Sequence, residues 1–146
     1  MRRLLGRQVY LDSNVLIYFL EEDRTYFPAV ARLFTLASTG GFRTLTGDLS
    51  VTEVLVHPIA SGDQTAVERI RAFLASGLVE IRPHTRWEFE QAAHIRASRR
   101  TSLPDALHLA TAVATGCTVL VTNDLRMPSV PGLEVVRLKE LDQLDG

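Results

Sequence analysis

The chain has 146 residues, 46% of them hydrophobic, with a formal net charge of −1 and a single cysteine, Cys117. These values predict one domain over residues 1–146, exclude a disordered chain and an internal disulfide, and argue by themselves against a nucleic-acid binder. Because no apolar run approaches the ~18 residues of a membrane-spanning helix and the basic N-terminus has no signal-peptide pattern, we expect a cytoplasmic protein with no membrane association.

Segments with strand and helix patterns alternate along the chain. In the first part of the chain we expect a strand at 7–11, helices at 14–20 and 27–37, a strand at 43–46 and a helix at 48–60. A helix capped by Asp63 and ending at Gly77 comes next, then a strand at 78–82 and a helix that begins at the capping box Thr85–Glu88 and runs to Ser98. The last elements are a helix with Pro104 in its first turn that ends at Gly116, strands at 118–122 and 133–137, and a short helix from Lys139. Pro58 is expected to kink or end the helix at 48–60.

This alternation predicts the α/β class, with a parallel sheet covered by helices on both faces. Ligands of such folds bind beyond the carboxyl ends of the strands, where the strand order reverses. Asp12 directly follows the first predicted strand, and Asp124 lies two residues beyond the strand at 118–122. If these two strands are neighbours, the two carboxylates meet at one edge of the sheet.

Four acids stand where apolar runs end or are interrupted: Asp12, Glu53, Asp105 and Asp124. Each has an ordinary structural explanation as well. Asp12 fits a helix cap, Glu53 a solvated helix face, Asp105 the positive end of a helix dipole, and Asp124 a turn. As a set from distant parts of one chain, they are what a hard divalent cation such as Mg²⁺ requires. A metal-dependent site directed at phosphate is therefore the leading hypothesis.

Four stretches together resemble the PIN-domain family, in the family's order and over nearly the whole chain. They are Tyr-Leu-Asp-Ser-Asn-Val-Leu-Ile from Tyr10, Ser-Val-Thr-Glu-Val from Ser50, Leu-Pro-Asp-Ala-Leu-His-Leu-Ala-Thr-Ala from Leu103, and Val-Leu-Val-Thr-Asn-Asp from Val119. As a lone domain of this size, the chain looks most like the VapC-type toxins of bacterial toxin–antitoxin pairs. The resemblance implies a three-layer α/β/α fold with a central parallel sheet.

The resemblance also implies an Mg²⁺- or Mn²⁺-dependent endoribonuclease that acts on RNA, forms a homodimer and is silenced by an antitoxin protein. The catalytic, metal-binding acids carry over to Asp12, Glu53, Asp105 and Asp124. The small polar residues that would support them are Ser13, Asn14, Thr122 and Asn123. Where the family often has a further acid after the last Asp, this chain has Leu125 and Arg126, so a second metal site would be weaker.

Basic residues near these motifs have two explanations. Arg96, Arg99 and Arg100 end a predicted helix just before the Asp105 segment. They can complement the negative end of that helix or bind RNA phosphates beside the site. His57 and His108 each share a helix face with an acid, but no further His or Cys cluster supports zinc. A structural role, or one that supports a metal ligand through a hydrogen bond, is therefore preferred to direct ligation.

Two other functions compete with the nuclease. The first is a catalytically silent PIN-like module that binds RNA or a protein, against which the presence of all four acids argues. The second is a haloacid-dehalogenase-like phosphatase, which also places Asp after a first strand. That chemistry wants a second acid two residues on, where this chain has Asn14, and no suitable downstream lysine exists.

Overall fold

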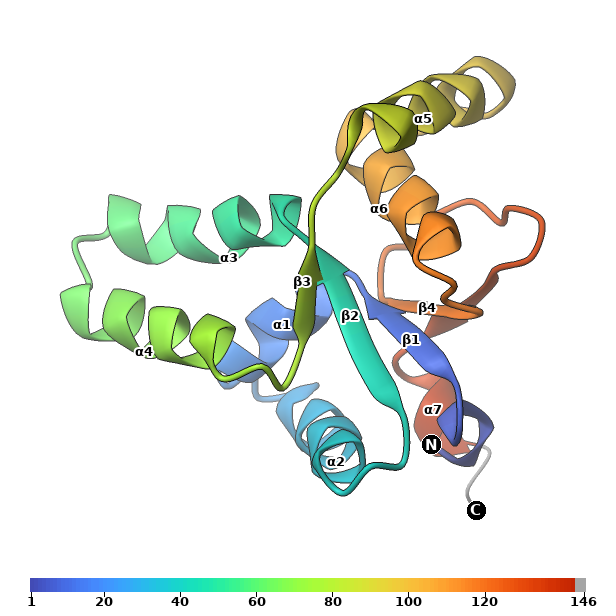
Figure 1. The fold of residues 1–146 in the computed structure, drawn as a ribbon. Coiled ribbons are helices and arrows are strands. Elements are labelled where there is room, and N and C mark those ends of the chain that lie inside the picture. Colours follow the sequence, from blue (N-terminus) through green and yellow to red (C-terminus); the bar gives the residue numbers. More distant parts are fainter. Residues whose placement is uncertain (144–146) are drawn as a thin grey trace.

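A five-stranded parallel sheet in the order β3-β2-β1-β4-β5 forms the centre of the computed structural model, which describes residues 1–143 (Figure 1). The strands are β1 Gln8–Leu11, β2 Arg43–Gly47, β3 Glu80–Arg82, β4 Val119–Thr122 and β5 Glu134–Arg137. From β1 the chain builds the sheet first toward β2 and β3 and later toward β4 and β5. The strand order therefore reverses between β1 and β4. These two strands are neighbours, which is the condition under which Asp12 and Asp124 meet at one edge of the sheet.

Helices cover both faces of this sheet. They are α1 Ser13–Leu20, α2 Phe27–Ser38, α3 Leu49–Ala60, α4 Gln64–Ala75, α5 Arg86–Ser98, α6 Leu103–Ala114 and α7 Glu140–Gln143, preceded by a short 3-10 helix, Arg2–Leu4. Successive side chains of a strand point to opposite faces. On β1, Val9 and Leu11 therefore join the core on the side of α1 and α2, whereas Tyr10 joins the core on the side of α6. The predicted three-layer α/β/α architecture is confirmed.

The helices differ in what they pack against: α1, α3 and α6 contact strands of the sheet, whereas α4 packs mainly on α3 and α5 mainly on α6. Figure 1 shows α1 and α2 beneath it, α3 and α4 running side by side away from its edge, and α5 lying across α6 on the other side. Because α5 packs mainly on α6, its face away from α6 is solvated, and Trp87 and Phe89 are about half exposed. Within residues 1–143, no helix combines the length and the apolarity that a membrane span requires.

Three local features of the secondary structure bear on the predictions. Strand β3 begins at Glu80 rather than at residue 78, because the Leu78 carbonyl accepts a hydrogen bond from the Thr44 hydroxyl. Helix α3 continues through Pro58 to Ala60, so the proline does not end it. The predicted capping role of Glu88 is present, since its carboxylate accepts the Thr85 backbone N–H at 3.1 Å.

Candidate active site

Asp12 and Thr122 meet where the two central strands end. Asp12 caps α1 directly after β1 and is 5% exposed, and its Oδ1 accepts the Ser13 backbone N–H at 2.8 Å. Thr122 is the last residue of β4, and its hydroxyl donates to Asp12 Oδ2 at 2.7 Å. Burial raises the pKa of Asp12, and the nearby His108 and the bond from Thr122 partly offset this increase. The side chain is thus held in one direction while its charge remains poorly solvated.

Asn14 joins these groups to the loop after β4. Its amide nitrogen donates to Asp12 Oδ2 at 3.3 Å and to Thr122 Oγ1 at 3.2 Å, and its amide oxygen accepts the Asn123 N–H at 3.4 Å. The Thr122 hydroxyl also accepts the Asp124 backbone N–H at 2.9 Å. All four small polar residues expected beside the acids therefore lie there, although Ser13 and Asn123 act through their backbone N–H groups.

Glu53 reaches the same region from α3 and is bound by a buried histidine. The Nε2 atom of His108, on α6, lies 2.8 Å from Glu53 Oε1 and 3.9 Å from Asp12 Oδ1. His108 is fully buried, and its other ring nitrogen lies 2.7 Å from the Tyr10 hydroxyl. His108 thus contacts two of the candidate acids, in keeping with the structural or supporting role that the sequence predicts for it. His57, by contrast, is exposed and lies 3.4 Å from Glu21.

A second histidine, which sequence reasoning missed, ties α3 to α6. The backbone N–H of Leu49 donates to His84 Nε2 at 3.2 Å, and His84 Nδ1 lies 2.6 Å from the Thr111 hydroxyl. His84 therefore caps α3, since the Asp48 side chain makes no capping bond. Burial, followed by the nearby His108, lowers the pKa of His84. Because Leu49 donates its N–H to Nε2, that nitrogen carries no proton. The spacing of His108 and Thr111 places both on one face of α6, but nothing in the sequence around His84 indicates its contact with them.

Asp105 and Asp124 complete the predicted set in contrasting environments. Burial raises the pKa of Asp105, and the charges of Asp12 and Asp124 raise it further. Burial would also raise the pKa of Asp124, but the side chain, backbone N–H and charge of Arg126 hold it below its usual value. The Arg126 guanidinium bonds both carboxylate oxygens, at 3.1 Å to Oδ1 and 3.3 Å to Oδ2. The family motif gave no indication of this contact.

The donor chemistry of these four acids suits a hard divalent cation, because each offers carboxylate oxygens and two of them have pKa values raised by poor solvation or mutual repulsion. Their present arrangement is not a finished metal site. Among the side chains that the structure describes, those of residues 1–141, no three of His, Cys, Asp or Glu converge closely enough to ligate one ion. Glu53 is bonded to His108 through Oε1 alone and could offer Oε2 to a metal, whereas Arg126 bonds both oxygens of Asp124, so Asp124 would have to exchange this partner for the metal.

The three arginines expected to bind RNA do not act alike. Arg100 lines a small hollow of about 180 Å³ together with Asp105 and Arg126, so it lies beside the acids. Arg96 donates from Nε to the Thr101 carbonyl at 3.3 Å, and Arg99 follows the last residue of α5. The structure therefore brings one of the three to the edge of the candidate site.

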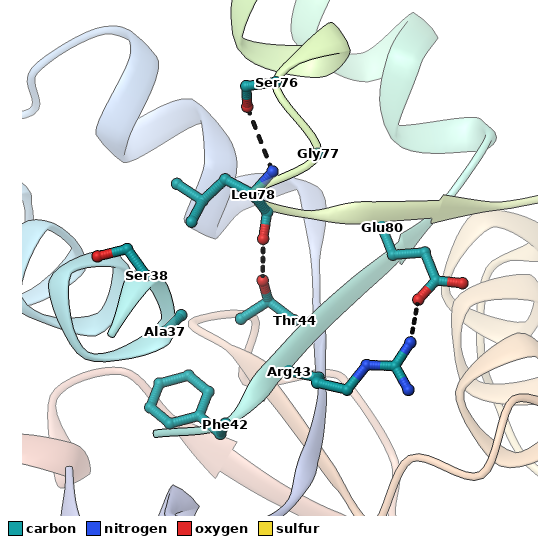
Figure 2. Close-up of a pocket in the computed structure, with 9 residues that line it drawn as sticks. All are labelled: Ala37, Ser38, Phe42, Arg43, Thr44, Ser76, Gly77, Leu78 and Glu80. Carbon is teal, nitrogen blue, oxygen red and sulfur yellow. Dashed lines mark hydrogen bonds and ion pairs between the residues drawn. The ribbon is translucent and has the colours of Figure 1, made fainter. Parts of the chain in front are cut away.

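A broader hollow of about 600 Å³ lies elsewhere, at the amino ends of β2 and β3 (Figure 2). Figure 2 shows Arg43 directed to Glu80 across its wall, with a distance of 2.7 Å between the charged groups, and Phe42 beside the end of α2. Because the acids follow the carboxyl ends of the strands, this hollow belongs to the opposite edge of the sheet. Its two charged lining residues, Arg43 and Glu80, pair with each other, so it is not a candidate catalytic site.

Comparisons with known proteins place this arrangement in context. A family model described as PIN domain matches residues 9–133, whereas no curated protein sequence matches the chain. Among solved structures, a toxin–antitoxin complex from Klebsiella pneumoniae aligns with a TM-score of 0.67 and 21% identity, over 86% of this chain and 94% of that one. VapBC2 from Rickettsia felis, bound to a DNA fragment from its promoter, gives 0.70 and 16%, over 89% and 98%.

A third solved structure is Mycobacterium tuberculosis VapC20, described as a toxin that cleaves the sarcin-ricin loop. It aligns with a TM-score of 0.63 and 16% identity, over 77% of this chain and 86% of that one. At these identities the structural alignments establish a shared fold. The alignments do not transfer the substrates and partners of these proteins to this chain.

Proposed function

Because this chain belongs to the PIN domain family, we propose that it is a metal-dependent endoribonuclease and the toxin of a type II toxin–antitoxin pair. One observation carries the proposal: Asp12 and Asp105, whose pKa values are both raised, share one end of the sheet with Glu53 and Asp124. Four carboxylates in one region repel one another unless a cation compensates their charge. The alignment with solved toxins supports the biological setting.

In this mechanism Asp12, Glu53, Asp105 and Asp124 would hold Mg²⁺ or Mn²⁺. When bound, such an ion lowers the pKa of a coordinated water and binds phosphate oxygens. The chain's own contribution is orientation. Thr122 and Asn14 direct the Asp12 carboxylate, and the Asp124 backbone is bonded to the same threonine hydroxyl. Arg100, beside Asp105, is suited to bind an RNA phosphate next to the one that is cut.

RNA cleavage by full-length protein tests the nuclease. We expect Asp12→Asn and Asp105→Asn each to reduce Mg²⁺-dependent cleavage by at least about 10-fold, since even changes behind the ligands of metal sites have effects of this size. Glu68→Gln, on the exposed surface of α4, is the matched control and should cleave like the wild type. Full cleavage by both aspartate variants, or in excess chelator, would contradict the assignment.

The alternative is a catalytically silent PIN-like module that binds RNA or protein. The contact of Asp124 with Arg126 favours it, because a cationic side chain of the protein already compensates the charge of this acid. The two functions differ in a simple measurement. A silent module binds RNA without producing new 5′ or 3′ ends at any concentration of Mg²⁺ or Mn²⁺.

The proposal includes a protein partner, a homodimer and action in the cytoplasm. An acidic crevice accepts either a metal with phosphate or a cationic side chain, so an antitoxin that inserts Arg or Lys would block both metal and RNA. A co-purified partner should therefore place a basic residue against Asp12, Glu53, Asp105 or Asp124. A complex that leaves these acids open and cleavage unimpaired would refute this mode of inhibition without affecting the nuclease assignment.

A further inference from the structure

A line of buried hydrogen bonds runs from the centre of the sheet to the acids. The Tyr10 hydroxyl lies 2.7 Å from His108 Nδ1, and His108 Nε2 lies 2.8 Å from Glu53 Oε1. We propose that Tyr10 fixes the tautomer of His108, so that His108 donates from Nε2 and holds the Glu53 carboxylate beside Asp12. His108 is in this role a positioning residue, and its relevance to catalysis rests on the proposed nuclease function.

The order of donors and acceptors follows from the groups at the two ends. An ionised carboxylate is only an acceptor, so Nε2 must carry a proton to bond Glu53. In a neutral imidazole the other nitrogen, Nδ1, is then an acceptor. A tyrosine hydroxyl keeps its proton at neutral pH and can supply the matching donor. The two hydrogen bonds thus run in one direction, from the Tyr10 hydroxyl to His108 Nδ1 and from His108 Nε2 to Glu53 Oε1.

A glycine beside Tyr10 leaves the space that its hydroxyl occupies in this row of hydrogen bonds. Gly47 ends β2, and a Cβ added there would lie 2.6 Å from the Tyr10 hydroxyl and 2.1 Å from His84 Cε1. Its backbone does not have the positive φ that favours glycine, so the absence of a side chain serves space alone. Tyr10 and His108 are both fully buried, and their rings contact edge to face at 5.6 Å.

Glu53 needs such a partner more than the other acids do. Its side chain is 32% exposed and has three rotatable bonds. The hydrogen bond from His108 is the contact that holds it near Asp12. Fixing a long side chain costs rotamer entropy, and two nearby carboxylates repel each other. The His108 N–H, 2.8 Å from Glu53 Oε1, offsets part of these costs, while Asp12, 3.9 Å away, is held by Thr122 and Asn14 instead. The His108 N–H therefore preorganises Glu53 as a candidate ligand.

Nitrogen-15 NMR of the histidine rings in the metal-free, full-length protein tests the tautomer directly. We expect His108 to be protonated at Nε2, with a slowly exchanging proton whose resonance moves in Glu53→Gln. We expect His84 to show the opposite tautomer, because the Leu49 N–H occupies its Nε2. His94, which is exposed on α5, is the internal reference for a solvated ring. Tyr10→Phe should leave the protein folded and make the His108 tautomers exchange.

A pair of substitutions tests the positioning role. His108→Gln retains an N–H group able to reach Glu53, whereas His108→Leu fills similar space without a donor. With Mn²⁺ alone as the probe, we expect His108→Leu to weaken binding by about 10-fold or more, in the range of outer-shell effects on metal affinity, and His108→Gln to restore most of it. In RNA cleavage the loss should fall on kcat rather than on KM, because RNA contacts are unchanged. Circular dichroism and thermal melting establish that both variants are folded.

Two results would overturn the proposal: a His108 protonated at Nδ1, or a folded His108→Leu variant with the Mn²⁺ affinity of the wild type. The NMR result does not depend on catalysis. If the wild-type protein neither binds Mn²⁺ nor cuts RNA, the nuclease function fails, while a fixed Nε2–H tautomer that responds to Tyr10→Phe and Glu53→Gln still supports the hydrogen-bonded positioning of Glu53.

Discussion

The guanidinium of Arg126 bonds both carboxylate oxygens of Asp124, the last of the four candidate metal ligands. Arg126 also donates its backbone N–H to the same carboxylate at 2.9 Å. The resemblance to the PIN-domain family implies a further acid near this point of the chain, where the sequence instead supplies a cation. Arg126 is 88% exposed, so it can leave Asp124 without breaking the core.

Arg126→Ala is therefore expected to increase the affinity for Mn²⁺. The gain should be small, about twofold to fivefold, because exposed ion pairs are weak and salt screens them. Isothermal titration calorimetry in low salt measures it. Arg71→Ala, an exposed arginine on α4, is the matched control and should leave the affinity unchanged. A weaker affinity in Arg126→Ala would mean that Arg126 supports the site rather than competing for it.

Divalent metal is expected to raise the melting temperature. A ligand at about 100 times its Kd stabilises the folded state by about 2.7 kcal/mol, which corresponds to several degrees for a domain of this size. The increase should shrink in Asp124→Asn, because that variant loses one of the groups the metal compensates. The measurement is a thermal melt with Mn²⁺ against the same ionic strength of NaCl. A melting temperature indifferent to millimolar Mn²⁺ would count against the site.

The metal-free protein is expected to lose stability as pH rises, in part through Asp105. Its pKa is raised in the folded state, so folding favours the protonated form. The resulting penalty is absent below the unfolded pKa of about 3.9 and grows as pH rises through the higher folded pKa. In chelator, Asp105→Asn should therefore gain unfolding free energy relative to the wild type between pH 4.5 and 7.5, by urea denaturation. Glu68→Gln should show no such trend, and added Mn²⁺ should reverse the order.

Thr122→Val tests the orientation of Asp12. The hydroxyl donates to Asp12 Oδ2 and accepts the Asp124 N–H, so its removal leaves the Asp124 N–H without this partner and Asp12 Oδ2 with only the Asn14 amide. Each unsatisfied buried group costs about 1–3 kcal/mol, and we expect Mn²⁺ affinity to fall by about 10-fold. Thr44→Val is the matched control, since Thr44 is also a buried strand threonine but bonds the Leu78 carbonyl at the other end of the sheet. Equal metal affinities in the two variants would contradict the role of Thr122.

Gly47→Ala is expected to destabilise the protein by about 1–3 kcal/mol, the usual range for overpacking a core. The added methyl group would collide with His84 and Tyr10. In a His84→Ala background the same substitution should cost less, because one of the two collisions is gone and residues in contact are not additive. Chemical denaturation of the four proteins in this cycle measures the difference. Strict additivity would mean that the glycine does not serve this space.

Local signals in the sequence were sufficient for much of the fold. The alternation of apolar strands with capped helices predicted the α/β class, and most strand and helix boundaries agree with the structure within two residues. Asp12 directly after β1 and Asp124 shortly after β4 indicated where acids would gather. Such signals succeed because strand and helix formation depends on residues only a few positions apart.

Only the tertiary structure decided which residues touch these acids. His108 is 55 residues from Glu53 and 98 from Tyr10, yet it bonds both, and His84 caps a helix 35 residues before it. Arg126 pairs with Asp124 through a turn whose shape the motif does not specify, and the size of residue 47 is set by two rings from other elements. Side chains distant in sequence meet according to strand order and helix packing, so their hydrogen bonds, and the preorganisation they provide, are properties of the assembled layers alone.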